Sequence, residues 1–290
     1  MANVIEDLLT HGPVITDGAW GTQLHALGLA SGECPDAWNL SHADRVEQVP
    51  RAYVDAGSQV VLTNTFRANR LALADYRLAD QTAAINTAGV EISRRAAGDR
   101  ARVFASIGPS GKMLFAGQVS KSELQQAFAE QARALASAGA DALVIETMAD
   151  LEEAKIAVTA AKTTGLPVVA CAVFDSGKDK DRIMTGRTPE EVAGVLTGAG
   201  ADVIGANCGQ GIASYVGICR RLRTATDRPI WIKANAGVPQ IVGDQVVYAV
   251  SAAEFAAHAP ELVEAGANFI GGCCGTSPEY IRAIRQRIGR

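Results

Sequence analysis

Eight short apolar runs recur along the 290 residues, and this repetition limits the possible folds more than any other feature. Each run ends in polar or glycine-rich residues, and the eight cover residues 14–21, 60–66, 103–111, 142–148, 168–175, 203–209, 230–237 and 269–275. Near-continuous apolar runs are typical of strands that are buried on both faces, as in parallel sheets. The pattern therefore predicts a largely parallel sheet built from eight strands.

The segments between the runs carry helix signals. Ser120 and Glu123 have the spacing of a capping box ahead of the apolar stripe of Leu124, Phe128, Leu135 and Ala138. Four runs follow a glycine that is suited to end a helix in the left-handed conformation, namely Gly57, Gly139, Gly200 and Gly266. Eight ordered strand–helix units predict a (β/α)8 TIM barrel, a single α/β domain over residues 1–290. An open doubly wound sheet is the alternative.

Composition and charge exclude several classes of protein. The net charge is −4 and no basic stripe stands out, so we expect no nucleic-acid partner. No stretch of eighteen apolar residues and no signal segment are present, which predicts a cytoplasmic protein without membrane contact. Six cysteines in a chain of this length are expected to be reduced thiols there.

Reactive and polar residues gather where the predicted strands end. Barrel enzymes carry their chemistry at the carboxyl ends of the strands. The residues at those ends are Asp17, Thr63, Asn64, Glu146, Asp175, Asn207, Cys208, Asn235, Cys273 and Cys274. The four histidines all fall outside these ends, so a histidine-based triad has little support.

Three of these residues suggest a metal site. Cys208 ends the sixth run and Cys273–Cys274 end the eighth, and alternate barrel strands point side chains into one layer. Neighbouring residues of a regular strand face opposite ways, so we expect Gly271 and Gly272 to break the strand and let both sulfurs converge. Three thiolates around one open position match a catalytic zinc site. The alternative is that the cysteines are core residues.

Two carboxylates offer a site for a cationic group. Asp17 follows the first strand beside Gly18, whose missing side chain allows a ligand to approach the backbone, and Glu146 ends an apolar run. We expect both carboxylates to bind a cation, with Thr63 lining the same substrate site. An Asx-type turn at Asp17 and a structural ion pair at Glu146 are the alternatives.

Seven short motifs carry a resemblance to a known family: "DGAWGTQL", "TNTF", "IGPSG", "IET", "ANCG", "NAG" and "GGCCGTSP". Together they resemble the homocysteine S-methyltransferase family over residues 12–288. The resemblance implies an enzyme of methionine biosynthesis that methylates the thiol of L-homocysteine, with one zinc ion per chain bound by Cys208, Cys273 and Cys274. It assigns no catalytic residue beyond this zinc site.

The resemblance also implies roles for three further residues. Asp17 and Glu146 would bind the amino group of homocysteine, and Asn235 would approach the zinc when substrate is absent. The chain has Ala234 where the family usually has proline before "NAG", which leaves the local turn open.

The methyl donor is external to a chain of this length. We expect a methylated corrinoid protein or another methyl-carrier protein, with betaine, a sulfonium compound or S-methylmethionine as the alternative. Trp20, Trp38 and Phe66 are the aromatic residues near the predicted mouth that would hold an onium group. Two other classes are a zinc-dependent barrel hydrolase or aldolase and a non-catalytic sensor that binds zinc and homocysteine.

Overall fold

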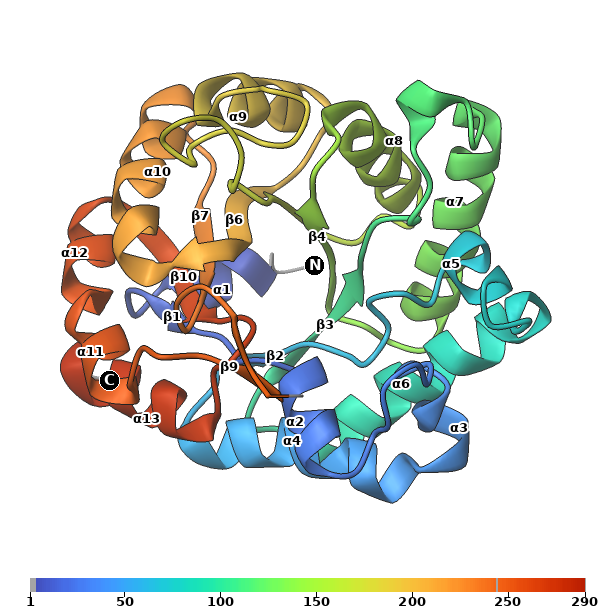
Figure 1. Ribbon diagram of the computed structural model, residues 1–290, viewed down its shortest axis with the longest axis horizontal. Helices are drawn as coiled ribbons and strands as arrows, with labels where there is room; N and C mark the ends of the chain where they lie inside the picture. The colour runs from blue at the N-terminus through green and yellow to red at the C-terminus, as the bar shows by residue number, and fades with distance from the viewer. Residues whose placement is uncertain (1–3, 244, 290) are drawn as a thin grey trace.

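The computed structural model describes residues 4–243 and 245–289 and places eight parallel strands in one barrel (Figure 1). The order around the sheet is β1-β10-β7-β6-β5-β4-β3-β2. The strands are β1 (Val14–Ile15), β2 (Val60–Val61), β3 (Arg102–Ile107), β4 (Ala142–Met148), β5 (Val168–Ala172), β6 (Val203–Gly211), β7 (Ile230–Asn235) and β10 (Ala267–Gly272). Each lies within or beside one of the eight apolar runs.

The first and last strands of this order meet, which distinguishes a barrel from an open sheet. The backbone N–H of Gln59, just before β2, donates to the carbonyl of Ile15 in β1 at 2.8 Å. The Ser58 hydroxyl donates to the carbonyl of Thr16 at 3.1 Å. The sheet is therefore nearly closed, and the prediction of a (β/α)8 barrel is confirmed.

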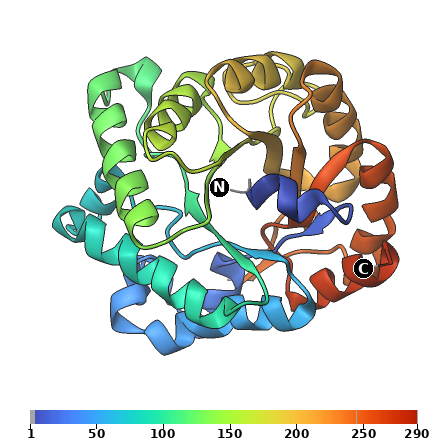
Figure 2. The same ribbon diagram turned by 180° about the vertical axis from the view of Figure 1, so that it is seen from behind.

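Helices surround the barrel on its outer face (Figures 1 and 2). The longer ones are α4 (Ala43–Ala56), α6 (Thr82–Ala97), α7 (Lys121–Ser137), α8 (Leu151–Lys162), α9 (Pro189–Gly198), α10 (Ile212–Ala225) and α13 (Pro278–Arg287). Shorter segments are α1 (Val4–Leu9), α2 (Gly21–Ala26), α3 (Trp38–Ser41), α5 (Arg70–Ala74), η1 (Ala79–Gln81), η2 (Leu114–Ala116), α11 (Ala252–Ala257) and α12 (Ala259–Glu264).

The local signals for these helices are confirmed. The Ser120 hydroxyl accepts from the N–H of Glu123, whose carboxylate accepts in return from the N–H of Ser120, and α7 begins there. The helix-closing glycines all have positive φ, as predicted: Gly57, Gly139, Gly200 and Gly266.

Side chains alternate across the barrel wall, so one set fills the interior. The interior cluster includes Val14, Phe104, Trp231 and Phe269, all fully buried. Helix α1 crosses the amino-terminal end of the barrel and adds Ile5 to this cluster (Figure 2). The interior is a packed core at this end, and the opposite end is free to hold a site.

One element was not expected from the sequence. The connection between β7 and α11 forms an antiparallel hairpin of β8 (Gln240–Val242) and β9 (Gln245–Val247) after the carboxyl end of β7. Residues 1–3, 244 and 290 of the predicted 1–290 domain lie outside the described residues. In the described ranges, every helix is too short or too polar to cross a membrane.

Candidate active site

Three cysteines meet at the carboxyl ends of two strands, β6 and β10, that flank β7 in the sheet. Cys208 lies near the end of β6, whereas Cys273 and Cys274 follow directly after β10. Their three sulfur atoms lie within 4.8 Å of one another, and each residue is partly exposed. Within the described residues, this is a group whose ligand atoms are close enough to hold one metal ion.

The backbone presents the sulfurs in a way that the sequence did not predict. Strand β10 continues through Gly271 and Gly272, neither of which has a positive φ, so the expected strand break at these glycines is wrong. The strand ends at Gly272, and Cys273 and Cys274 lie in the turn that follows, where Gly275 has φ 81°. Cys208 itself has φ 64°.

The two glycines are needed for close packing instead. A Cβ atom on Gly271 would lie 2.0 Å from Thr16 Oγ1 and 2.5 Å from the carbonyl oxygen of Asp17. A Cβ on Gly272 would lie 2.3 Å from Thr276 Oγ1. The Thr276 hydroxyl donates to the Cys273 carbonyl at 2.7 Å, which fixes the turn that carries both thiols.

Hydrogen bonds within the cluster favour a thiolate at one position. Cys273 and Cys274 donate to Cys208, which lowers the pKa of Cys208, and a hydrogen bond from Asn235 acts in the same direction. The same bonds raise the pKa of Cys273 and of Cys274. Tyr248, after the hairpin, hydrogen-bonds to Cys274 and was not found by the sequence analysis.

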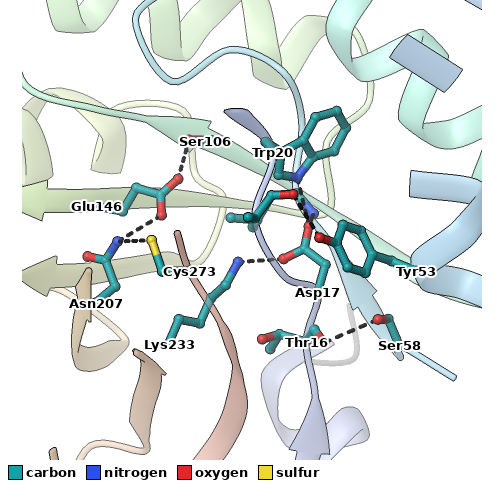
Figure 3. A network of polar contacts seen from close by, with 12 residues as sticks. Thr16, Asp17, Trp20, Tyr53, Ser58, Ser106, Glu146, Asn207, Lys233 and Cys273 are labelled. Carbon is teal, nitrogen blue, oxygen red and sulfur yellow. Dashed lines mark hydrogen bonds and ion pairs between the residues drawn. The ribbon is translucent and has the colours of Figure 1, made fainter. Parts of the chain in front are cut away.

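Asp17 is fully buried beside a cation that the sequence analysis missed. Its Oδ1 lies 2.5 Å from Nζ of Lys233 on β7, and its Oδ2 accepts from Trp20 Nε1 and from the N–H of Leu62, both at 2.8 Å (Figure 3). Burial disfavours the charged form of Lys233, but the Asp17 and Glu146 carboxylates outweigh it and raise the pKa of Lys233. The sequence did contain a signal for Lys233. It lies two residues after Trp231 and two before Asn235, and because side chains alternate along a strand, all three point to the same face.

Glu146 lies across the same space from Asp17. Its Oε1 accepts from the Ser106 hydroxyl at 2.5 Å and its Oε2 from Asn207 Nδ2 at 3.1 Å (Figure 3). Burial raises the pKa of Glu146, and the charge on Lys233 and the Ser106 hydrogen bond oppose this effect. Asn207 Nδ2 also lies 3.9 Å from the Cys273 sulfur, so one amide links the carboxylate to the thiol cluster.

A pocket of about 320 Å³ connects these groups. Its lining includes the predicted residues Gly18, Thr63, Glu146, Cys208, Cys273 and Cys274, together with Lys233, Asp36, Arg67, Trp20 and Phe66. Asp17 is not a lining residue, but its partners Lys233 and Trp20 are. Asn235 lies behind Cys208, where its Nδ2 donates to the Gly209 carbonyl at 2.9 Å and its Oδ1 is buried without a hydrogen-bond partner.

Other residues considered from the sequence lie elsewhere. Trp38 is 4% exposed on α3 and stacks on His42 with ring centroids 4.5 Å apart, so its expected place at the mouth is wrong. Cys34, Cys171 and Cys219 are buried packing residues.

Known proteins are similar to this chain over nearly its whole length. Residues 14–288 match the sequence model of a family described as homocysteine S-methyltransferase. The methionine synthase of Mycobacterium tuberculosis is 32% identical over 97% of this chain, and that of Mycobacterium leprae is 29% identical over 98%. Both matches cover 25% of the relative, so the chain spans about a quarter of the length of these relatives.

Solved structures share the fold. The homocysteine methyltransferase MmuM from Escherichia coli, in its metallated form, matches with a TM-score of 0.83 and 23% identity, covering 98% of this chain and 100% of that chain. Its apo form matches with a TM-score of 0.75 and 22% identity. This likeness supports the same barrel architecture.

Proposed function

The chain belongs to the homocysteine S-methyltransferase family, and we propose that it transfers a methyl group to the thiol of L-homocysteine, giving methionine. One observation carries the proposal most directly: three thiols within 4.8 Å of one another line the same pocket as Glu146. The pocket therefore combines a site for a soft metal with a carboxylate suited to an ammonium group.

We propose that zinc is the metal and that Cys208, Cys273 and Cys274 hold it, one ion per chain. Three sulfur donors select soft or borderline metals and disfavour magnesium and calcium. The orphaned Oδ1 of Asn235, whose amide also hydrogen-bonds to Cys208, supplies a further donor atom for the state without substrate. When bound, zinc lowers the pKa of a coordinated thiol enough to supply a thiolate nucleophile at neutral pH.

The protein's own residues then position the reactants and exclude water. The apolar side chains of Leu62, Trp20 and Phe66 wall the pocket, and Glu146 would bind the acceptor's ammonium group one amide away from Cys273. Attack of the acceptor sulfur on the methyl carbon forms the S–C bond and releases the carrier with the bonding electron pair. This scheme uses no general base of the protein, and positioning supplies the remaining acceleration.

The metal assignment is tested by substitution. Cys208→Ser, Cys273→Ser and Cys274→Ser should each lose bound zinc, measured by elemental analysis of purified protein, because two soft ligands no longer complete the site. Cys34→Ser is the control, since Cys34 is buried outside the pocket, and it should retain about one zinc per chain. Stoichiometric zinc in all three site variants would overturn the assignment.

We propose a methylated corrinoid protein, or another methyl-carrier protein, as the donor. The support is the similarity to methionine synthases of which this chain matches only a quarter. Trp20 and Phe66 line the pocket and keep a small onium donor as the alternative. A donor screen with homocysteine, in which methionine is detected by mass spectrometry, distinguishes the two. Turnover with betaine or S-methylmethionine alone would contradict a carrier requirement, and no methionine with any donor would favour a sensor.

A further inference from the structure

Lys233 is a charged side chain inside the pocket that the proposed chemistry does not yet use. It is 2% exposed, and its Nζ lies 2.5 Å from Asp17 Oδ1, where Figure 3 shows it between the carboxylates of Asp17 and Glu146. A buried ammonium is costly unless it is paired and hydrogen-bonded. A position inside a ligand pocket therefore needs an explanation beyond stability.

The hydrogen-bonding capacity of Asp17 is almost used up within the protein. Its Oδ2 accepts two bonds, from Trp20 and Leu62, and its Oδ1 accepts from Lys233. Asp17 is 0% exposed and is not among the residues that line the pocket, whereas its partners Lys233 and Trp20 are. The ammonium of an acceptor would therefore have to displace one of these partners to reach this carboxylate. Asp17 is thus a counter-ion that holds Lys233 in place, and it is poorly available to a ligand.

Lys233, unlike Asp17, keeps hydrogen-bonding capacity for a ligand. An ammonium group carries three donors, and in the described part of the chain Asp17 is the side chain to which Nζ is seen to donate. Because Lys233 also lines the pocket, its remaining N–H groups can reach an anionic group of a ligand.

Glu146 completes the pair. Counting the residues that the structure describes, its two oxygens each accept one bond, from the uncharged groups of Ser106 and Asn207, which leaves a lone pair on each oxygen. The pocket therefore presents one cation and one anion that a ligand can bind. An α-amino acid carries the two complementary charges on a single carbon.

We propose that Lys233 is a specificity-determining residue that binds the α-carboxylate of the acceptor thiol, while Glu146 binds its ammonium group and Asp17 positions Lys233. This inference rests on the proposed function. It changes the role implied by the family resemblance, in which Asp17 and Glu146 both bind the amino group. The acceptor is then a thiol on an α-amino acid, and a thiol amine without a carboxylate is a poor ligand.

The test is a binding cycle between enzyme and acceptor, measured by calorimetry on the zinc-loaded protein. L-Homocysteine is compared with 3-mercaptopropylamine, which lacks the carboxylate, in the native protein and in Lys233→Met. We expect the native protein to prefer homocysteine by about tenfold or more, the effect of a charge-assisted hydrogen bond. Lys233→Met should abolish this preference while 3-mercaptopropylamine binds about as before.

Two further variants separate binding from a structural role. Lys233→Met leaves Asp17 without its cation, so the double variant Lys233→Met/Asp17→Asn removes that buried charge as well. If Lys233 served only to neutralise Asp17, the double variant would recover the preference for homocysteine, and the proposal would be overturned. Lys162→Met is the matched control, because Lys162 is a half-exposed lysine paired with Asp202 and should leave both affinities unchanged.

The outcomes also distinguish this inference from the proposed function. Equal affinities of the native protein for both thiols, or equal losses of both in Lys233→Met, would refute the role of Lys233 and leave homocysteine methylation standing. No binding of either thiol to the native protein would refute the proposed function, and this inference with it.

Discussion

Gly271 shows how one missing side chain controls the site. The residue lies inside β10 against Thr16 and the backbone of Asp17, with no room for a Cβ atom. We expect Gly271→Ala to lower the free energy of unfolding by about 1–3 kcal/mol, the usual cost of overpacking, because backbone atoms cannot move aside cheaply.

Chemical denaturation measures this effect against a second glycine. Gly217, within α10, has nothing within 4 Å of an added Cβ. Gly217→Ala should stabilise the protein by roughly 0.5–1 kcal/mol because alanine is the better helix former. Equal effects of the two substitutions would contradict the close approach at Gly271.

Two residues beside the pocket have an unusual backbone conformation. Cys208 and Thr147 both have φ near 60°, with values of 64° and 61°, and both lie where strands end at the pocket. Such left-handed backbone is uncommon for residues other than glycine and is typical of functional sites. The Thr147 N–H donates to Asn207 Oδ1 at 2.7 Å, which orients the amide between Glu146 and Cys273.

At the level of elements, the capping box of α7 is a local feature that the sequence predicts. Ser120→Ala removes the hydroxyl that accepts from the N–H of Glu123. We expect the variant to lose about 1 kcal/mol of stability, seen as a lower melting temperature in a thermal unfolding experiment. Ser137→Ala in the last turn of the same helix is exposed and should have little effect.

The cluster of three thiols, by contrast, depends on how elements pair. Strands β6 and β10 both pair with β7, and the N–H of Cys273 donates to the carbonyl of Ala234 on β7 at 2.7 Å. The same strand carries Lys233 and Asn235. Strand β7 therefore sets the spacing of the three thiols and carries Lys233, the cation of the proposed amino-acid site.

Across the whole molecule, the two ends of the barrel differ: one is a packed core and the other carries the pocket. The amino-terminal end is closed by α1, and Ile5 is 3% exposed among interior core residues. Ile5→Ala should lower the free energy of unfolding by about 2–5 kcal/mol, the cost of a core cavity. Zinc content at a temperature well below the transition should not change, because the metal cluster lies at the opposite end.

Two measurements on the same preparation check this separation. Denaturant unfolding reports the stability loss, and elemental analysis reports the zinc. Loss of zinc in folded Ile5→Ala protein would contradict the separation of the two ends. Cys208→Ser should show the reverse pattern, with zinc lost and the barrel still folded.

The sequence by itself determined the barrel and the three thiols. Apolar runs, helix-closing glycines and the capping box at Ser120 act locally, so each is legible without its neighbours. The placement of Cys208 with Cys273 and Cys274 followed from strand order alone. The reason given for Gly271 and Gly272 was wrong because a backbone contact between distant segments is invisible in a linear sequence.

Only the tertiary structure decided how the charges pair. Asp17 and Lys233 are 216 residues apart in the chain, and lysine is normally a surface residue. The barrel brings β1, β4 and β7 around one space, where burial forces each charge to find a partner. The sequence analysis gave the two carboxylates the same role, but the tertiary structure separates them: Asp17 is buried as the counter-ion of Lys233, whereas Glu146 lines the pocket.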